Sequence, residues 1–232
     1  MKITVINPNS SESMTEHIHA ELERIKRPET ELVVLCTEGA PPAIQSATDV
    51  ALATPPLLEL VRRANRDKSD AVIIACFSDP GLEAAREQSD ILVLGIQETS
   101  VHVACMLGHR YSILTPLKAR IASKEQDVRR FKVESALASV RALGMTVAET
   151  DADPMRTKAR VLDVARQAME VDGAEVMVLG CAGMIGYAKD VEKELGIIII
   201  DPTTVAFKIC ESFVELGVHH CKKGLYATPL PH

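Results

Sequence analysis

Two of the six cysteines stand where a thiol could carry acid–base chemistry. Cys76 closes the apolar run Ala71–Cys76 and Cys181 follows the run Glu175–Leu179, and each is followed at once by a turn into a predicted helix. Backbone N–H groups and the positive end of a helix dipole favour the thiolate form at such a place. Cysteine is also a common buried apolar residue, but two thiols at equivalent strand ends favour the chemical interpretation over packing.

A pair of thiols can invert a carbon centre. One sulfur removes a proton from one face of the carbon, and the other sulfur supplies a proton to the opposite face. A single base would tend to return the proton to the face from which it came. One sulfur must therefore be thiolate while the other is thiol. Since a free cysteine with a pKa of about 8.5 is only a few per cent ionised at neutral pH, we expect helix termini and turn amides to lower the pKa of at least one.

The other chemistry-bearing side chains have simpler interpretations. Asp79 could act on a proton, but Asp-Pro after a strand is more economically a helix N-cap. His102 lies in a helical stretch, where we expect a satisfied, partly buried imidazole, and we expect the polar tail His219–Cys221 to be solvated. Packing or exposure accounts for the remaining cysteines, which are Cys36, Cys105, Cys210 and Cys221.

We assign neither a metal nor a cofactor. The sequence has no CxxC, and no second histidine or carboxylate stands at a ligand spacing from His102. The first turn between a predicted strand and helix is the segment 7–11, Asn-Pro-Asn-Ser-Ser. It contains no glycine, so the GxGxxG and Walker A patterns of nucleotide sites are absent.

Short β-branched runs alternate with segments of 3.6-residue periodicity along the whole chain. Strands that are apolar on both faces and alternate with helices predict parallel sheets covered by helices, so the fold class is α/β. The predicted strands are Ile3–Asn7, Glu31–Thr37, Ala71–Cys76, Leu92–Ile96, Tyr111–Thr115, Met145–Glu149, Glu175–Leu179 and Ile197–Ile200. The predicted helices are Ser13–Lys26, Leu57–Arg66, Pro80–Gln88, Ala119–Leu143, Thr157–Glu170, Met184–Leu195 and Pro202–Leu216.

Capping residues support these helices. Ser13 with Glu16 reads as a capping box, and Asp201 before Pro202 reads as an N-cap with proline at the first helical position. The glycines that stand where helix C-caps belong are Gly108, Gly144, Gly196 and Gly217.

The two halves of the chain resemble each other. Asp70–Ile96 and Ala174–Asp201 both read as strand, cysteine turn, helix and strand, and their cysteines are 105 residues apart. Upstream, the predicted strands that end at Asn7 and Thr115 are each followed by proline. Any α/β protein resembles itself at coarse grain, but the matched cysteines favour two similar α/β halves.

Composition excludes several classes of protein. The 232 residues are 47% hydrophobic and 25% charged with a formal net charge of −6, which is typical of a globular domain and not of a disordered chain. The acidic balance and the 3% of aromatic residues offer no nucleic-acid surface. No run approaches the roughly 18 apolar residues of a membrane span, and no secretory h-region is present. We expect a cytoplasmic homo-oligomer that binds neither nucleic acid nor membrane.

Several segments are similar to those of a known family. They are Val5-INPNSS with MT after it, Ala75-CFSDPGL with ARE after it, Gly95-IQE, LGCAGM around Cys181, and Ile200-DP. Over essentially its whole length the chain resembles the Asp/Glu/hydantoin racemase superfamily, most closely its hydantoin and allantoin racemases. The resemblance implies two pseudo-symmetric α/β domains, 1–98 plus 206–232 and 99–205, with the active site in the cleft between them.

The resemblance also implies a cofactor-independent reaction on a small molecule, with paired cysteines as acid and base. Carried onto this chain, Cys76 and Cys181 are the catalytic pair. The positions that look like substrate contacts are Asn7, Phe77, Ser78, Thr115, Ala182 and Gly183.

Two departures from the superfamily bear on the substrate. Its amino-acid racemases carry Asp in the first turn and His two residues after the second cysteine, where this chain has Asn7 and Gly183. Loss of a proton beside a neutral imide carbonyl needs fewer auxiliary charges than loss of one beside a carboxylate. The departures therefore favour a cyclic ureide over aspartate or glutamate. The proline-rich segment Gly39–Asp49 also departs from the family's looser loop.

We predict a racemase that interconverts D- and L-5-monosubstituted hydantoins. Allantoin racemase, with the same chemistry and a ureido side chain, is the nearest alternative. A decarboxylase or cis–trans isomerase of the superfamily is less favoured because both thiol positions are filled. From a different class, the alternative is a two-lobed small-molecule binding protein in which both cysteines only pack.

Overall fold

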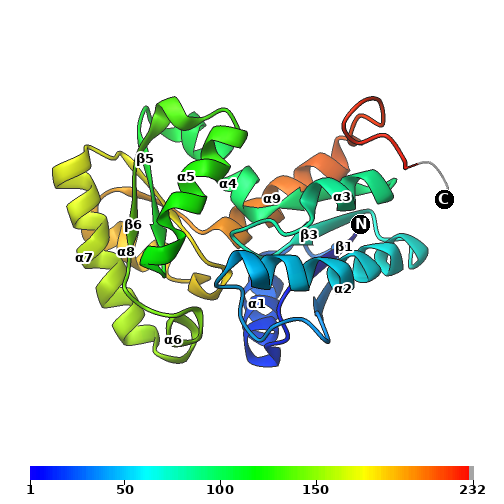
Figure 1. Ribbon diagram of the computed structural model, residues 1–232, viewed down its shortest axis with the longest axis horizontal. Helices are drawn as coiled ribbons and strands as arrows, with labels where there is room; N and C mark the ends of the chain where they lie inside the picture. Colours follow the sequence, from blue (N-terminus) through cyan, green and yellow to red (C-terminus); the bar gives the residue numbers. More distant parts are fainter. Residues whose placement is uncertain (230–232) are drawn as a thin grey trace. The chain divides into compact units, whose positions relative to one another are not determined.

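The computed structural model describes residues 1–229, which form two compact units of alternating strands and helices (Figure 1). The first unit is Met1–Ile96 together with the chain from Ala206 onward, and the second is Gln97–Val205. Each unit contains one four-stranded parallel sheet with helices packed on it. The predicted α/β class is confirmed.

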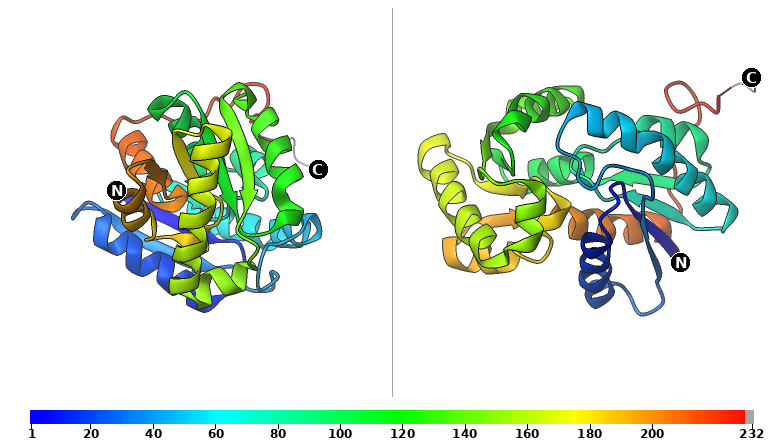
Figure 2. Two further views of the ribbon diagram at one scale, coloured as in Figure 1. Left: turned by 90° about the vertical axis from the view of Figure 1, so that its left-hand side faces the viewer. Right: turned by 60° about the horizontal axis from the view of Figure 1, so that its bottom comes forward.

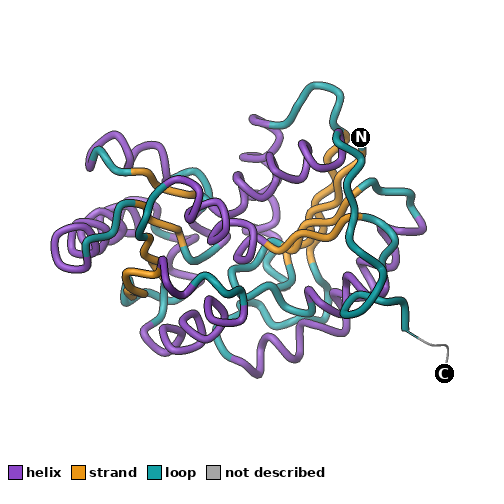
Figure 3. The backbone as a smooth tube through the Cα atoms, turned by 90° about the horizontal axis from the view of Figure 1, so that it is seen from above, coloured by secondary structure: helices purple, strands orange, loops and turns teal. Residues whose placement is uncertain are grey.

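The first unit has the strand order β2-β1-β3-β4. Its strands are β1 (Lys2–Asn7), β2 (Glu31–Cys36), β3 (Ala71–Ile74) and β4 (Leu92–Gly95). Its connecting helices are α1 (Glu12–Ile25), α2 (Ala47–Arg66) and α3 (Leu82–Gln88). Because α1 connects strands in one direction across the sheet and α2 and α3 in the other, right-handed crossovers place them on opposite faces. Figure 3 shows helices on both sides of these strands.

The second unit repeats this order as β6-β5-β7-β8. Its strands are β5 (Tyr111–Thr115), β6 (Leu137–Ala142), β7 (Val176–Leu179) and β8 (Ile198–Ile200). Its helices are α5 (Ile121–Arg130), α6 (Val147–Ala152), α7 (Pro154–Asp172) and α8 (Ala188–Leu195), with 3-10 turns η1 (Lys118–Arg120), η2 (Glu134–Ala136) and η3 (Ala182–Met184). Helix α5 covers one face of this sheet while α7 and α8 cover the other (Figures 1 and 2).

The chain passes between the units in two helices, α4 (Ile96–Leu107) and α9 (Pro202–Glu215). The division falls between Ile96 and Gln97 in the first and between Val205 and Ala206 in the second, so each boundary lies in a first helical turn.

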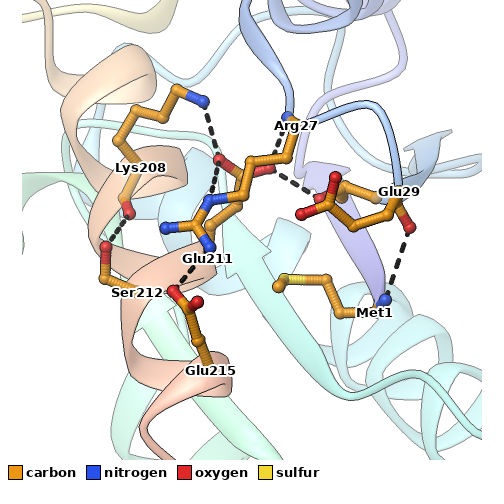
Figure 4. A network of polar contacts seen from close by, with 8 residues as sticks. Met1, Arg27, Glu29, Lys208, Glu211, Ser212 and Glu215 are labelled. Atoms are coloured by element: carbon orange, nitrogen blue, oxygen red, sulfur yellow. Dashed lines mark hydrogen bonds and ion pairs between the residues drawn. The ribbon is translucent and has the colours of Figure 1, made fainter.

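Helix α9 is attached to the first unit through a buried carboxylate (Figure 4). Glu211 is completely inaccessible to solvent. It accepts hydrogen bonds from the Arg27 backbone N–H at 2.8 Å, the Thr30 hydroxyl at 2.7 Å and the Lys208 ammonium at 2.7 Å. A buried carboxylate is stable only when its oxygens are satisfied in this way.

The segment after α9 packs on the first unit, where we had expected a solvated tail. The His220 ring nitrogen lies 2.8 Å from the Val93 carbonyl on the edge strand β4, and Tyr226 contacts the same ring. The Lys222 ammonium donates to the carbonyls of Arg86, Glu87 and Ser89 at the end of α3. The expectation is confirmed for His219 and Cys221, which are exposed, and is wrong for His220, which is half-buried because its ring bonds an edge strand.

Two predicted elements of the second unit are wrong. The helix Ala119–Leu143 ends at Arg130, and Leu137–Ala142 is the edge strand β6, paired with β5. The predicted strand Met145–Glu149 instead leads into α6, which begins with a capping box between Thr146 and Glu149. Pairing with β5 decides this region, since half-exposed edge strands lack a clear periodicity of their own.

Several helix starts also differ from the predictions. Ser11, and not Ser13, caps α1 through a bond from the Met14 backbone N–H. Helix α2 begins at Ala47 rather than at Leu57, and it continues through Pro55 and Pro56. Helix α8 begins at Ala188 after η3, and the C-cap glycine at Gly196 is confirmed. Gly144 follows β6 rather than a helix. Asp201 accepts from Thr203 and Thr204 as the predicted N-cap.

No helix among residues 1–229 is long and apolar enough to span a bilayer.

Candidate active site

In the first unit, Cys76 lies in the turn that follows β3. The Ala75 N–H donates to the Ile6 carbonyl at 2.8 Å, so the pairing of β3 with β1 continues to the residue before the cysteine. The Asp79 N–H then donates to the Cys76 carbonyl at 3.0 Å and closes the turn. Cys76 is half-buried. Parallel α/β sheets bind ligands at this carboxyl edge.

The other predicted residues of this unit lie at the same edge. Phe77 is buried and Ser78 half-buried in the turn after Cys76. Asn7 ends β1 and is fully buried. The unit thus brings its four predicted site residues together.

Asn7 has a structural role in the loop after β1. The side-chain amide of Asn7 donates to Asn9 Oδ1 at 2.8 Å and to Thr15 Oγ1 at 2.9 Å. The backbone carbonyl of Asn7 accepts from the Thr37 hydroxyl at 2.7 Å. A carboxylate could not donate either of the first two bonds. The asparagine at this position is therefore matched to the loop that it holds.

In the second unit, Cys181 occupies the equivalent place after β7. The Gly180 N–H donates to the Leu114 carbonyl at 2.8 Å, as Ala75 does to Ile6 in the first unit. Cys181 is 8% exposed, and the Met184 N–H donates to its carbonyl at 3.2 Å as η3 begins. Each cysteine lies two residues past the last residue of its strand that is paired with the neighbouring inner strand.

Thr115, Ala182 and Gly183 complete the second set of predicted residues. Thr115 ends β5 with 1% of its surface exposed, and Ala182 and Gly183 are buried in η3. All four predicted residues of this unit therefore lie at the carboxyl edge of its sheet.

Burial raises the pKa of the Cys181 thiol. The Gly183 N–H and the Thr150 hydroxyl act on the sulfur in the opposite direction, as does the charge of Lys124, but burial outweighs them. The expected lowering by turn amides is present at Cys181 and is too small to reverse the sign. The direction favours a protonated Cys181 in the free protein.

Two residues beside Cys181 were missed by the sequence analysis. Thr150 is fully buried in α6, with its hydroxyl 2.7 Å from the Val147 carbonyl, but it had been placed just after a predicted strand. Lys124 is 1% exposed, with its ammonium 3.3 Å from Gln97 Oε1. A lysine in a polar helix reads as a surface residue, so the sequence carries no signal for its burial.

Gly180 is a third missed residue, and here a signal existed. A Cβ at Gly180 would stand 2.7 Å from the Leu114 carbonyl oxygen and 3.0 Å from the Thr115 Cα. Glycine inside a strand pattern marks such a close approach of two backbones. The Gly–Cys pair at the end of β7 thus fixes how closely Cys181 lies to the end of β5.

Two of the remaining candidates also lie at the carboxyl edge of the first sheet, since Asp79 is in the turn after Cys76 and Cys36 ends β2 beside Asn7. Asp79 is not the N-cap of α3, because that helix begins at Leu82 after Gly81. His102 is exposed rather than partly buried, and its ring bonds the Glu98 carbonyl. Cys210 is buried in α9, where burial raises its pKa. Cys36 and Cys105 are half-buried and Cys221 is exposed.

The part of the chain that the structure describes contains no group of three His, Cys, Asp or Glu side chains arranged to hold a metal ion.

Comparison with known proteins identifies relatives that cover nearly the whole chain. Residues 3–210 match the family model described as Asp/Glu/Hydantoin racemase. A hydantoin racemase from Pseudomonas sp. (strain NS671) is 36% identical over 99% of this chain and 92% of its own length. A hydantoin racemase from Paenarthrobacter aurescens is also 36% identical, over 99% of this chain and 98% of its own. The solved structure of an allantoin racemase from Klebsiella pneumoniae superposes with a TM-score of 0.96 at 34% identity, covering 100% of this chain and 95% of that one.

Proposed function

The chain belongs to the Asp/Glu/hydantoin racemase family, and from this premise we propose that it interconverts the D- and L-forms of 5-monosubstituted hydantoins. It is an isomerase of the racemase type. The substrate and the acid–base pair are the content of the proposal. The observation that carries it is the equivalence of Cys76 and Cys181 in two sheets of the same strand order.

The reaction needs no group beyond two sulfurs and hydrogen-bond donors. A thiolate takes the proton from C5, and the electron pair of the broken C–H bond spreads into the adjacent ring carbonyl as an enolate. The thiol of the second cysteine then gives its proton to the other face of C5, and the enolate pair forms the new C–H bond. The first sulfur ends as thiol and the second as thiolate, so the next turnover starts from the opposite enantiomer.

We assign Cys181 as the acid of the resting enzyme. Its pKa is raised by burial, which keeps the thiol protonated until a substrate is bound. The half-buried Cys76 is then the base. Backbone N–H groups of the two turns, at Phe77 and Ser78 and at Ala182, would stabilise the charge that develops on the ring oxygen, while the Gly183 N–H acts on the Cys181 sulfur.

A neutral ring suits the residues of the two edges better than a free amino acid. Asn7 carries no charge, its side-chain N–H group is held by Asn9 and Thr15, and Gly183 has no side chain to act as an acid. A substrate that forms its enolate beside an imide carbonyl does not require those charges.

The experiment is to replace each cysteine by serine and to follow loss of optical rotation of L-5-benzylhydantoin. We expect Cys76→Ser and Cys181→Ser each to lower kcat by about 10³-fold, the range of acid–base groups. Exchange of the C5 hydrogen in D₂O should survive in one variant for one enantiomer. Cys105→Ser, which changes a half-buried cysteine of α4, is the matched control. Wild-type activity in either single variant of the pair would refute the assignment.

Allantoin is the second candidate substrate, favoured by the likeness to the Klebsiella enzyme over the full chain. Rates with allantoin and with 5-benzylhydantoin, measured side by side on the wild-type protein, decide between the two.

A cytoplasmic location, a homo-oligomeric state and the domains 1–98 plus 206–232 and 99–205 complete the proposal. Light scattering after size-exclusion chromatography measures the number of subunits. Limited proteolysis should cut at the domain boundaries before it cuts within either sheet.

A further inference from the structure

The loop after Cys76 contains a residue in a strained conformation. Asp79 has φ of +41°, in the left-handed region that residues other than glycine rarely adopt, and it is 4% exposed. Its carboxyl group packs against the Cα of Gly95, where a Cβ would lie closer than 3.0 Å to all three carboxyl atoms. Gly95 is the last residue of β4. The loop is thus joined to the end of the neighbouring strand.

The loop after Cys181 has a similar connection. Asp201 directly follows β8 and is 6% exposed. Its Oδ2 accepts the Gly186 N–H at 2.9 Å, and Gly186 has φ of +90° in the loop five residues after Cys181. Its Oδ1 accepts the N–H groups of Thr203 and Thr204 at 3.0 and 3.1 Å, in the first turn of α9.

Each connection joins an aspartate to a glycine, but the two residues exchange places between the units. In the first unit the aspartate is on the cysteine loop and the glycine ends the strand, whereas in the second the glycine is on the loop and the aspartate follows the strand. The strand ends are also equivalent in another respect. Helix α4 starts directly after Gly95, helix α9 starts directly after Asp201, and each contains a division between the units in its first turn.

We propose that Asp79 and Asp201 are positioning residues. Each connects one cysteine-bearing loop to the strand end at which a helix passing to the other unit begins, α4 for Asp79 and α9 for Asp201. This inference rests on the proposed function for its catalytic meaning. Burying a carboxylate is costly, and strained backbone persists only where the surrounding structure holds it. Both aspartates are buried, and Asp79 is also in a strained conformation, in or beside the loops that carry the two thiols. Each carboxylate then holds its cysteine loop in a fixed position relative to the start of the following helix.

The test measures the alkylation rate of each cysteine by iodoacetamide, resolved by peptide mass spectrometry, together with kcat and KM on 5-benzylhydantoin. In Asp201→Asn the amide oxygen still accepts from Thr203 and Thr204, but the amide N–H₂ cannot accept from Gly186. Asp201→Ser is a second variant, since serine retains the N-cap and is too short to reach Gly186. Gly95→Ala displaces the Asp79 carboxyl, and Asp79→Gly removes the side chain that packs on Gly95 while suiting the left-handed region.

We expect the Asp201 variants to speed alkylation of Cys181 by about tenfold and to leave Cys76 within about twofold, because only one loop opens. Asp79→Gly and Gly95→Ala should give the reverse pattern. All four should lower kcat by about tenfold with little change in KM, since a small displacement of a reacting group is costly. The matched controls are Asp153→Asn, which replaces the N-cap carboxylate of α7 by an amide, and Asp70→Asn, which makes the same change in the acceptor of the Lys2 N–H. Both controls should leave both alkylation rates unchanged.

Equal changes at both cysteines, or no change at the tied cysteine, would overturn the inference, because either result indicates a general loss of stability or a loop held by other contacts. The alkylation pattern does not depend on turnover. If the wild-type protein racemises no hydantoin and the selective pattern appears, the proposed substrate fails while the two connections stand. If racemisation is present and the pattern is absent, the inference fails alone.

Discussion

The two cysteine loops share their topology and their backbone hydrogen bonds, and they differ in burial and in the side chains around the sulfur. Cys76 is half-buried and is preceded by Ala75, whereas Cys181 is buried and is preceded by Gly180, which the backbone of β5 approaches closely. Burial raises the pKa of Cys181, and the Gly183 N–H and Thr150 hydroxyl only moderate the effect. The strand order places both thiols, and the local packing decides how readily a thiol ionises. In a two-thiol racemase this asymmetry has a use, because one sulfur must start protonated.

The ends of α9 offer a second comparison between the units. Glu211 holds the helix in the first unit with bonds from an ammonium group, a hydroxyl and a backbone N–H. Asp201 holds it in the second with backbone N–H groups and no cation. The same type of group is therefore buried in two different electrostatic settings.

The largest effect is expected from Glu211→Ala. Removing the carboxylate leaves Lys208, Arg27 and Thr30 without their shared acceptor, so we expect a loss of about 4 kcal/mol in the free energy of unfolding. Urea denaturation measures it. Glu215→Ala is the control, since its exposed pair with Arg27 is screened by solvent and should contribute little. Equal losses in the two variants would show that burial of Glu211 has no special weight.

A smaller effect is expected from exchanging the residues before the two cysteines. Gly180→Ala places a Cβ against the backbone of β5, which cannot move aside, so we expect a loss of about 2–3 kcal/mol in the free energy of unfolding. The equivalent change in the first unit, Ala75→Gly, should cost about 1 kcal/mol through added flexibility and the loss of one buried methyl group. Thermal denaturation of the two variants provides the comparison. A tolerated Gly180→Ala would contradict the close approach described for β7.

The two carboxylates of α9 should respond to pH with opposite sign. Burial raises the pKa of Glu211, but bonds from Lys208, Arg27 and Thr30 outweigh it and lower the pKa overall. Its contribution to stability is present above the unfolded pKa of about 4.3 and is lost as pH falls through the folded value. Burial raises the pKa of Asp201 more than its N–H donors lower it. That contribution is present below about 3.9 and is lost as pH rises through the folded value.

Hydrogen exchange measured between pH 3 and pH 7 checks this prediction. On acidification the Arg27 amide should lose protection while the amides of Gly186 and Thr203 gain it. Glu211→Gln should remove the first trend and Asp201→Asn the second. A common trend at all three amides would contradict the opposite signs.

The smallest effect is expected at Thr150. Thr150→Val keeps the shape of the side chain and removes the hydroxyl, which donates to the Val147 carbonyl and would have to turn toward the Cys181 sulfur to stabilise a thiolate. The thiol pKa should therefore rise further. One hydrogen bond of about 1 kcal/mol corresponds to a roughly fivefold slower alkylation of Cys181 at fixed pH. Thr157→Val, which removes a buried hydroxyl bonded to the Thr150 carbonyl, is the control and should leave the rate unchanged. A faster reaction in Thr150→Val would show that the hydroxyl shields the sulfur instead.

Much of the sheet architecture was predictable, and the failures have a common cause. The central strands β1, β3, β5 and β7 are buried on both faces, so their apolar runs stand out in the sequence. The edge strand β6 is half-exposed and contains Ser139 and Arg141, and it was mistaken for the continuation of a helix. An edge strand obtains its conformation from its single neighbour, which a local pattern does not contain.

The candidate site was predictable to the same extent. The positions of Cys76 and Cys181 followed from strand ends, because the carboxyl edge of a parallel sheet is the place where turns into helices present side chains. Asp79 was misassigned because Asp-Pro is a good N-cap signal, and the contact with Gly95 that replaces this role comes from the next strand. Thr150 and Lys124 were not predicted because they lie on other elements, α6 and α5, and influence the Cys181 thiol only in the folded chain.

Local sequence patterns were enough to establish the α/β class, the duplicated strand–cysteine–helix unit and the absence of a nucleotide-binding motif from the sequence. Only the folded arrangement decided which carboxylates are buried, which hydroxyl acts on a sulfur and which glycine makes room for a neighbouring backbone. The reason is physical: periodicity and capping act over a few residues, whereas burial and the pKa of a thiol depend on every group that tertiary packing brings within a few ångströms.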